Sequence, residues 1–159
     1  MDKERLIKKI IGQLVEELEA YFRAAHVAHA ESTHEQSKAE NKYDTRALEA
    51  SYLAHGQARQ AAELEAAIAA FENMEARSFG VNDPIGIGAL VELEDAGQRT
   101  FYFIAANAGG MELQHEKKEV LVITPKSPLG QQLQGKKEGD LVQLSLGRAS
   151  TKYRVAAVS

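Results

Sequence analysis

The chain has 159 residues, of which 44% are hydrophobic and 26% charged, and it contains no cysteine. The hydrophobic content excludes a wholly disordered chain, and the length suits one or two small domains with a core. The absence of cysteine excludes a disulfide framework, a thiol nucleophile and a zinc ribbon. No apolar run reaches membrane-spanning length, and the charged start of the chain argues against a signal peptide. We therefore expect a soluble, cytoplasmic protein without a membrane partner.

The net charge of −4 is distributed unevenly along the chain. Residues 1–78 carry 14 acidic and 10 basic residues, whereas residues 79–159 carry 9 of each. Proteins that bind nucleic acid through its phosphates usually show a clear basic excess. The balance of charges therefore favours a protein partner over bare DNA.

The first half of the chain shows the spacing of a coiled coil. Steps of three and four residues separate Ile7, Ile11, Leu14, Leu18, Tyr21, Ala25 and Ala28. A polar stretch follows from His34 to Asp44, and a second apolar stripe contains Leu48, Leu53, Ala61, Leu64, Ile68, Phe71 and Met74. Two such stripes predict an antiparallel helical hairpin over residues 1–77, with its tip at about 33–45. A coiled coil that pairs between chains, in a homodimeric scaffold, is the alternative.

The second half is typical of short strands. Residues 78–84 are rich in turn formers and predict a linker. Apolar and polar residues then alternate over 89–94 and 100–105 around a turn, which predicts a hairpin. Further strands are expected at 120–124, 141–144 and 153–158. With a short helix at 127–133, begun by Ser127 as N-cap and Pro128, residues 85–159 predict a small antiparallel β-rich domain and an α+β chain.

One segment resembles a known family. The run SPLGQQLQGKKEGDLVQL, Ser127–Leu144, resembles the C-terminal signature of the bacterial transcript-cleavage (GreA/GreB-like) factors: Ser-Pro, a short helix, Gly-Lys, and Gly-Asp before a strand. The order of a hairpin and then a β-rich domain extends the resemblance over nearly the whole chain. It implies an FKBP-like domain without isomerase activity that docks on RNA polymerase. Ser127, Pro128 and Leu129 are the expected contact residues.

The resemblance also implies a role for the hairpin tip. In this family the hairpin enters the secondary channel of the polymerase, and tip acids help to hold a second Mg²⁺ for hydrolysis of backtracked RNA. The factor needs no intrinsic cofactor, is not itself an enzyme, and contacts nascent RNA only indirectly. The family pattern is an acid, two residues and Glu-Asn. Here Ser37 replaces the first acid, whereas Glu40 and Asn41 are retained.

Glu40 is therefore the expected catalytic-support carboxylate, and Asp44 or Glu35 is the expected second acid. Glu40 and Asp44 are the expected Mg²⁺ ligands, shared with the polymerase, because Mg²⁺ prefers carboxylate oxygens together with waters and phosphates. The simpler interpretation of these acids is a solvated loop. His26 and His29 are spaced to share a metal, but the zincin pattern His-Glu-x-x-His is absent. A metal enzyme centred on the histidines is therefore a distant alternative.

The sequence thus predicts a monomeric Gre-type elongation factor that binds RNA polymerase and regulates elongation or stimulates cleavage of backtracked RNA. A relative that occupies the channel without stimulating cleavage is the close alternative. DNA binding is expected only because the resemblance implies a transcription factor; the charge pattern does not indicate it.

Overall fold

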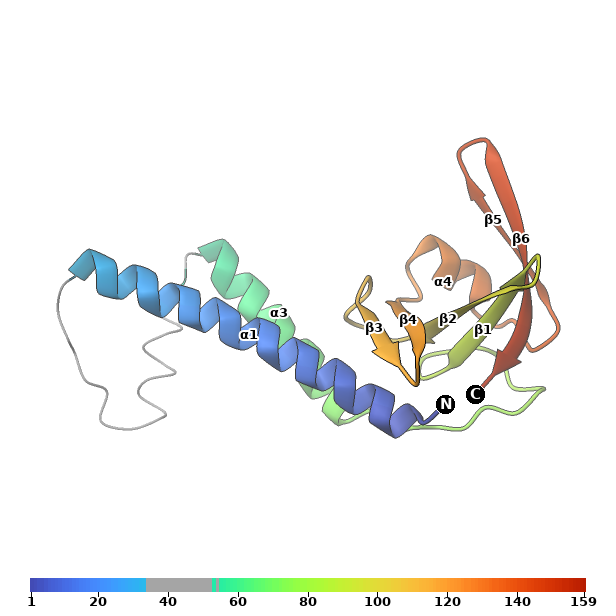
Figure 1. The fold of residues 1–159 in the computed structure, drawn as a ribbon, viewed down its shortest axis with the longest axis horizontal. Coiled ribbons are helices and arrows are strands. Elements are labelled where there is room, and N and C mark those ends of the chain that lie inside the picture. The colour runs from blue at the N-terminus through green and yellow to red at the C-terminus, as the bar shows by residue number, and fades with distance from the viewer. Residues whose placement is uncertain (34–52, 54) are drawn as a thin grey trace. The chain divides into compact units, whose positions relative to one another are not determined.

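The computed structural model describes residues 1–33, 53 and 55–159 (Figure 1). Contacts divide them into two compact units. One contains Met1–Lys9 and Asn73–Ser159 and is called the β unit here, and the other, Ile10–Glu72, is called the helical unit. The predicted segments 1–77, 78–84 and 85–159 divide the chain by position along the sequence, whereas the two units are defined by contacts in space. The contacts add that the first residues of the N-terminal helix pack in the β unit.

Two helices form the helical unit. They are α1, Lys3–Thr33, which belongs to this unit from Ile10 onward, and α3, His55–Glu72, and within the unit they lie side by side (Figure 1). Leu18 and Phe22 of α1 form a buried cluster with Ala61 of α3, against which Leu53, Leu64 and Ile68 pack. The Tyr21 hydroxyl donates a hydrogen bond to Oε1 of Gln60, with an O···O distance of 2.7 Å. The predicted helical hairpin is thus confirmed as packing within one chain.

The buried stripe of α1 differs from the predicted one at two positions. Ile10 and Phe22 are buried, whereas Ile11 and Tyr21 are only half-buried. The predicted Ile7, Leu14, Leu18 and Ala25 are buried, and Ile10 and Phe22 are buried beside them in place of the neighbouring Ile11 and Tyr21.

The second helix ends earlier than its apolar stripe predicts. The helix stops at Glu72, and Met74 follows it as a half-buried residue outside the helix. The predicted tip at about 33–45 lies outside the described residues from position 34 onward, as does Leu48.

The β unit contains a six-stranded sheet in the order β3-β4-β2-β1-β6-β5 (Figure 1). Its strands are β1 Leu90–Asp95, β2 Gln98–Ile104, β3 Glu112–His115, β4 Lys118–Ile123, β5 Leu141–Leu146 and β6 Ala149–Val158. The predicted hairpin of the first two strands is confirmed, with Asp95 paired to Gln98. Ala96 and Gly97, the two residues of its turn, both have positive φ angles, as the tight hairpin turn that suits strand twist requires.

The predicted antiparallel pairing is found in four of the five neighbouring strand pairs, but one pair is parallel, so the sheet is mixed. β2 and β4 pair in parallel, with Tyr102 opposite Leu121, whereas the other neighbouring strands are antiparallel. The cause is β3, which the sequence analysis did not predict. β3 lies at the edge of the sheet and forms an antiparallel hairpin with β4. The chain therefore reverses at β3 and again at β4, so that β4 runs parallel to β2.

The core of the β unit lies between one face of the sheet and the short helix α4, Pro128–Leu133. Leu133 is fully buried there together with residues from five strands and from the segment before β1. The members of this core are Phe79, Ile85, Ala89, Val91, Leu93, Ile104, Ile123, Leu133, Val142, Val155 and Val158. Two backbone hydrogen bonds, from Ile85 N to Lys136 O and from Gly135 N to Ile85 O, connect the segment before β1 to the turn after α4. Both hold α4 in place beside the sheet.

No helix in the described ranges is long and apolar enough to cross a membrane.

Candidate functional site

The predicted tip residues Glu35, Ser37, Glu40 and Asp44 lie outside the described residues. Their role and the shared Mg²⁺ therefore stay predictions. His26 is exposed on α1, and residues 1–33, 53 and 55–159 contain no group of three or more side chains suited to hold a metal ion. The structure thus adds nothing in favour of the histidine alternative.

The predicted contact residues Ser127, Pro128 and Leu129 lie at the N-terminal end of α4, and we call residues 127–130 the docking turn. Ser127 is the N-cap of α4, as predicted: its Oγ accepts a hydrogen bond from Gly130 N at 3.0 Å. The same hydroxyl donates to the carbonyl oxygen of Thr124 at 2.8 Å. Pro128 occupies the first helical position, where its missing N–H costs nothing. One serine side chain therefore connects the end of β4 to the start of the helix.

Gly130 is the residue of this turn that the sequence analysis did not single out. A Cβ atom built on Gly130 would lie 1.9 Å from the carbonyl oxygen of Thr124 and 2.8 Å from Ser127 Oγ. No side chain fits in that space, because van der Waals contact between such atoms needs more than 3 Å. Gly130 stands in the sequence as the fourth residue of Ser-Pro-Leu-Gly, but its position along the chain does not reveal a steric requirement.

The docking turn presents its residues to solvent in different degrees. Pro128 is exposed, Ser127 and Leu129 are half-buried, and Gly130 is buried. Leu129 packs partly against the core of the β unit. The turn therefore combines an exposed proline ring with a backbone that is held by internal hydrogen bonds, which suits a preformed protein contact.

Lys3 is a second residue that the sequence did not mark. Only 9% of it is exposed, and its Nζ donates hydrogen bonds to the carbonyl oxygens of Arg77 and Gly88. The same atom lies 4.8 Å from the centroid of the Phe79 ring. Desolvation by burial, with the nearby charge of Arg77, lowers the pKa of Lys3 to about 8. Lys3 thus attaches the start of α1 to the segment that precedes β1.

A second contact of the same N-terminal residues involves the β3–β4 turn. Asp2 caps α1 by accepting a hydrogen bond from Arg5 N, which lowers the pKa of Asp2. The backbone N–H of Asp2 donates to Oε1 of Glu116, and this bond lowers the pKa of Glu116. His115 is fully buried beside Glu116, and neither ring nitrogen has a hydrogen-bond partner among the described residues. Its Nε2 lies 3.6 Å from Oε1 of Glu116.

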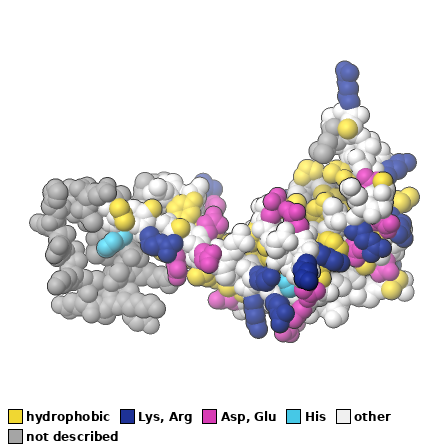
Figure 2. Space-filling view, viewed as in Figure 1, with side chains coloured by type: hydrophobic (Ala, Val, Ile, Leu, Met, Phe, Trp, Pro, Cys, Tyr) yellow, Lys and Arg dark blue, Asp and Glu magenta, His cyan; other side chains and the backbone are white. Residues whose placement is uncertain are grey.

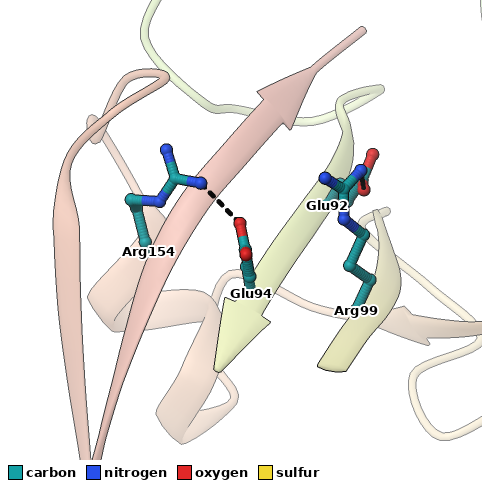
Figure 3. A network of polar contacts seen from close by, with 4 residues as sticks. All are labelled: Glu92, Glu94, Arg99 and Arg154. Atoms are coloured by element: carbon teal, nitrogen blue, oxygen red, sulfur yellow. Dashed lines mark hydrogen bonds and ion pairs between the residues drawn. The ribbon is translucent and has the colours of Figure 1, made fainter. Parts of the chain in front are cut away.

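Two ion pairs connect three strands on the face of the sheet opposite to the core. Arg99 of β2 donates to Glu92 of β1 at 2.6 Å, and Arg154 of β6 donates to Glu94 of β1 at 2.5 Å (Figure 3). Both arginine side chains are more than half exposed. Each pair therefore stabilises the unit by about 1 kcal/mol at most.

Acidic and basic side chains are interspersed over the visible face of the β unit and do not gather by sign (Figure 2). This distribution agrees with the equal numbers of acidic and basic residues in the second half of the chain. That face offers no basic patch of the kind that a phosphate backbone selects.

Comparison with known proteins identifies the family. Residues 81–159, which include all six strands and the docking turn, match the family described as "Transcription elongation factor, GreA/GreB, C-term". The transcription inhibitor protein Gfh1 of Thermus aquaticus is 29% identical over 98% of this chain and 90% of its own length. Gfh1 of Thermus thermophilus is 30% identical over 73% of this chain and 72% of its own length.

Two solved structures are also similar. The structure of Thermus aquaticus Gfh1 is 24% identical, with a TM-score of 0.41, and the match covers 98% of this chain and 92% of that one. GreA factor homolog 1 of Thermus thermophilus is 21% identical, with a TM-score of 0.38, over 99% and 94% of the two chains.

The class of protein that these sequence matches define is that of transcription elongation factors. This chain belongs to the GreA/GreB family, and the resemblance indicated by the run Ser127–Leu144 is confirmed.

Proposed function

We propose that this chain binds RNA polymerase through the docking turn of the β unit and places the helical hairpin in the secondary channel. There it occupies the channel and regulates elongation, with little or no stimulation of RNA cleavage. The main support for this proposal is the geometry of the docking turn. Its exposed Pro128 stands on a backbone fixed by Ser127 and Gly130, so binding costs little ordering entropy.

The helical unit supports the second part of the proposal. α1 has 31 residues, which corresponds to about 46 Å at 1.5 Å per residue. Its Leu18 and Phe22 pack against α3 of the same chain, and Tyr21 forms a hydrogen bond with Gln60. A helix pair that satisfies its apolar face internally is suited to enter a channel as a separate arm.

The tip sequence supports the choice of a regulator over a cleavage factor. Ser37 stands where the family pattern has an acid. A serine hydroxyl lacks the negative charge with which a carboxylate holds Mg²⁺ between substrate phosphates. The relatives from Thermus are themselves named transcription inhibitors.

Glu40 and Asn41 favour a second candidate function, support of transcript cleavage, because they retain the rest of the motif. In that case Glu40 with Asp44 or Glu35 would hold the shared Mg²⁺. Under this candidate the polymerase itself supplies the reaction centre.

A transcription assay on a stalled, backtracked elongation complex tests the proposal. We expect the wild-type chain to slow elongation and to compete with a cleavage-stimulating factor, without releasing short RNA products itself. Release of such products, and its loss in the variant Glu40→Ala, would establish the cleavage candidate instead. A chain that neither binds the polymerase nor changes elongation would contradict both.

A further inference from the structure

A groove of about 370 Å³ lies in the β unit, at the end of the sheet where β2 and β4 begin. Its lining comes from three neighbouring strands, β2, β4 and β3, and contains two aromatic residues and four charged ones.

The floor of the groove is apolar. Tyr102 of β2 and Leu121 of β4 are paired residues of the parallel ladder, so their side chains lie next to each other on one face of the sheet. Both are half-buried, and both pack against the core of the β unit. Leu129 of the docking turn packs against the same core. The groove and the docking turn therefore belong to the same face of the sheet.

Two glutamates stand beside this floor. Glu112 of β3 is the antiparallel partner of Leu121, and Glu119 lies two residues before Leu121 on β4. Side chains two residues apart on a strand share a face, so both carboxylates lie on the face of Tyr102. Both residues are exposed, and neither carboxylate has a hydrogen bond or an ion pair within the described part of the chain.

The positive charges of the lining already have partners. Arg99 is paired with Glu92, and Nζ of Lys118 lies 4.4 Å from the centroid of the Phe101 ring. Both residues sit at strand positions that face the opposite side of the sheet, since they alternate with Thr100 and Glu119. The charge left without a partner in the groove is therefore negative.

We propose that this groove binds an arginine side chain presented by the protein to which the β unit docks. A guanidinium stacks on an aromatic ring and forms hydrogen-bonded ion pairs with carboxylates, and its stem covers apolar surface. Tyr102 offers the ring, Glu112 and Glu119 the carboxylates, and Leu121 the apolar contact. The identity of the partner as RNA polymerase rests on the proposed function, whereas the chemistry of the groove does not.

The first experiment tests the groove without any polymerase. The whole chain is titrated with N-acetyl-arginine amide, and the NMR signals of Tyr102 and Leu121 are followed. N-acetyl-citrulline amide, which has the same shape without the charge, is the matched ligand. We expect shifts with the arginine compound at millimolar concentration, none with the citrulline compound, and none in the double variant E112Q/E119Q. Equal responses to both compounds, or no response at all, would overturn the inference.

The second experiment measures affinity for RNA polymerase. We expect E112Q/E119Q to weaken binding at least tenfold relative to wild type. The control E4Q/E75Q, which removes two exposed charges elsewhere in the β unit, should stay within about twofold. Unchanged binding by E112Q/E119Q, with binding by wild type intact, would show that the groove takes no part in docking. Failure of the wild type itself to bind would contradict the proposed function, and the arginine titration would still decide the groove.

Discussion

The hydroxyl of Ser127 accepts a hydrogen bond from the backbone N–H of Gly130 at 3.0 Å, and the same hydroxyl donates to Thr124 at 2.8 Å. This pair of bonds explains why serine and glycine occur three residues apart in the docking turn. Serine satisfies the free N–H at the start of α4, and glycine leaves room for the Thr124 carbonyl. The exposed Pro128 lies between Ser127 and Gly130, which are connected by this hydrogen bond.

Substitution of the exposed residue of the docking turn tests the polymerase contact. We expect Pro128→Ala to weaken polymerase binding with little loss of fold, because the ring faces solvent and the position donates no hydrogen bond. Ser127→Glu should weaken binding as well, and loss of the cap itself costs only about 1 kcal/mol. Fluorescence anisotropy with labelled protein measures affinity, and circular dichroism checks the fold. Unchanged affinity in both folded variants would place the contact elsewhere.

Gly130→Ala should destabilise the β unit more than loss of the Ser127 cap does. The new Cβ would lie 1.9 Å from the Thr124 carbonyl oxygen, which is backbone and cannot move aside cheaply. We expect a loss of about 2 to 4 kcal/mol in the free energy of unfolding, measured by denaturant titration. Gly12→Ala is the control: a Cβ at this position of α1 meets nothing within 4 Å, so it should stabilise the helix by about 1 kcal/mol.

Lys3 should make the stability of the β unit depend on alkaline pH. Its pKa is about 8 in the folded protein and 10.5 in the unfolded chain. Between these two pH values the unfolded chain binds more protons at Lys3 than the folded protein does. The contribution of Lys3 to the free energy of unfolding therefore rises with pH, by about 1.4 kcal/mol per pH unit at most. Below pH 8 both states carry the proton and the contribution is constant.

The variant Lys3→Met isolates this effect. Denaturant titrations at pH 7, 8, 9 and 10 should show that wild type gains stability relative to Lys3→Met as the pH rises. Lys8→Met, which changes an exposed lysine of the same helix, should follow the wild-type curve. Parallel curves for wild type and Lys3→Met would mean that Lys3 is solvated in the folded protein.

The helical hairpin should be monomeric in dilute solution. Leu18 and Leu64 already pack within one chain, which leaves little of the apolar stripe for a partner helix. Sedimentation velocity over a hundredfold range of concentration should give a single species of 17.4 kDa. A dimer that persists at the lowest concentration would support the scaffold alternative.

The tip acids decide between the two candidate functions. If the wild-type chain supports cleavage, Glu40→Ala and Asp44→Ala should each reduce the rate by a hundredfold or more, since loss of a metal ligand removes several kcal/mol of transition-state stabilisation. Both variants should still compete with wild type for the polymerase, because the docking turn is unchanged. If wild type gives no cleavage and Ser37→Asp creates it, channel occupancy is the native role. Cleavage that is indifferent to Glu35, Glu40 and Asp44 together would contradict the assignment of the tip.

Local chemistry could be predicted from the sequence wherever neighbouring residues determine it. The N-cap at Ser127, the turn at Ala96 and Gly97 and the helical period around Leu18 all depend on residues within one or two turns of the chain. The family could be recognised for the same reason, since its signature is a continuous segment.

Only the tertiary structure revealed relationships between distant segments. The parallel pairing of β2 with β4 depends on the edge strand β3, whose four residues are too few to show a clear period. Lys3 is buried because the segment around Arg77 and Gly88 returns to the start of α1, more than seventy residues away. The clash that requires Gly130 arises from the path of the backbone and not from residue type. Hydrophobic pattern and capping are local and can be read along the chain, whereas burial, register and steric fit come into existence only when the chain has folded.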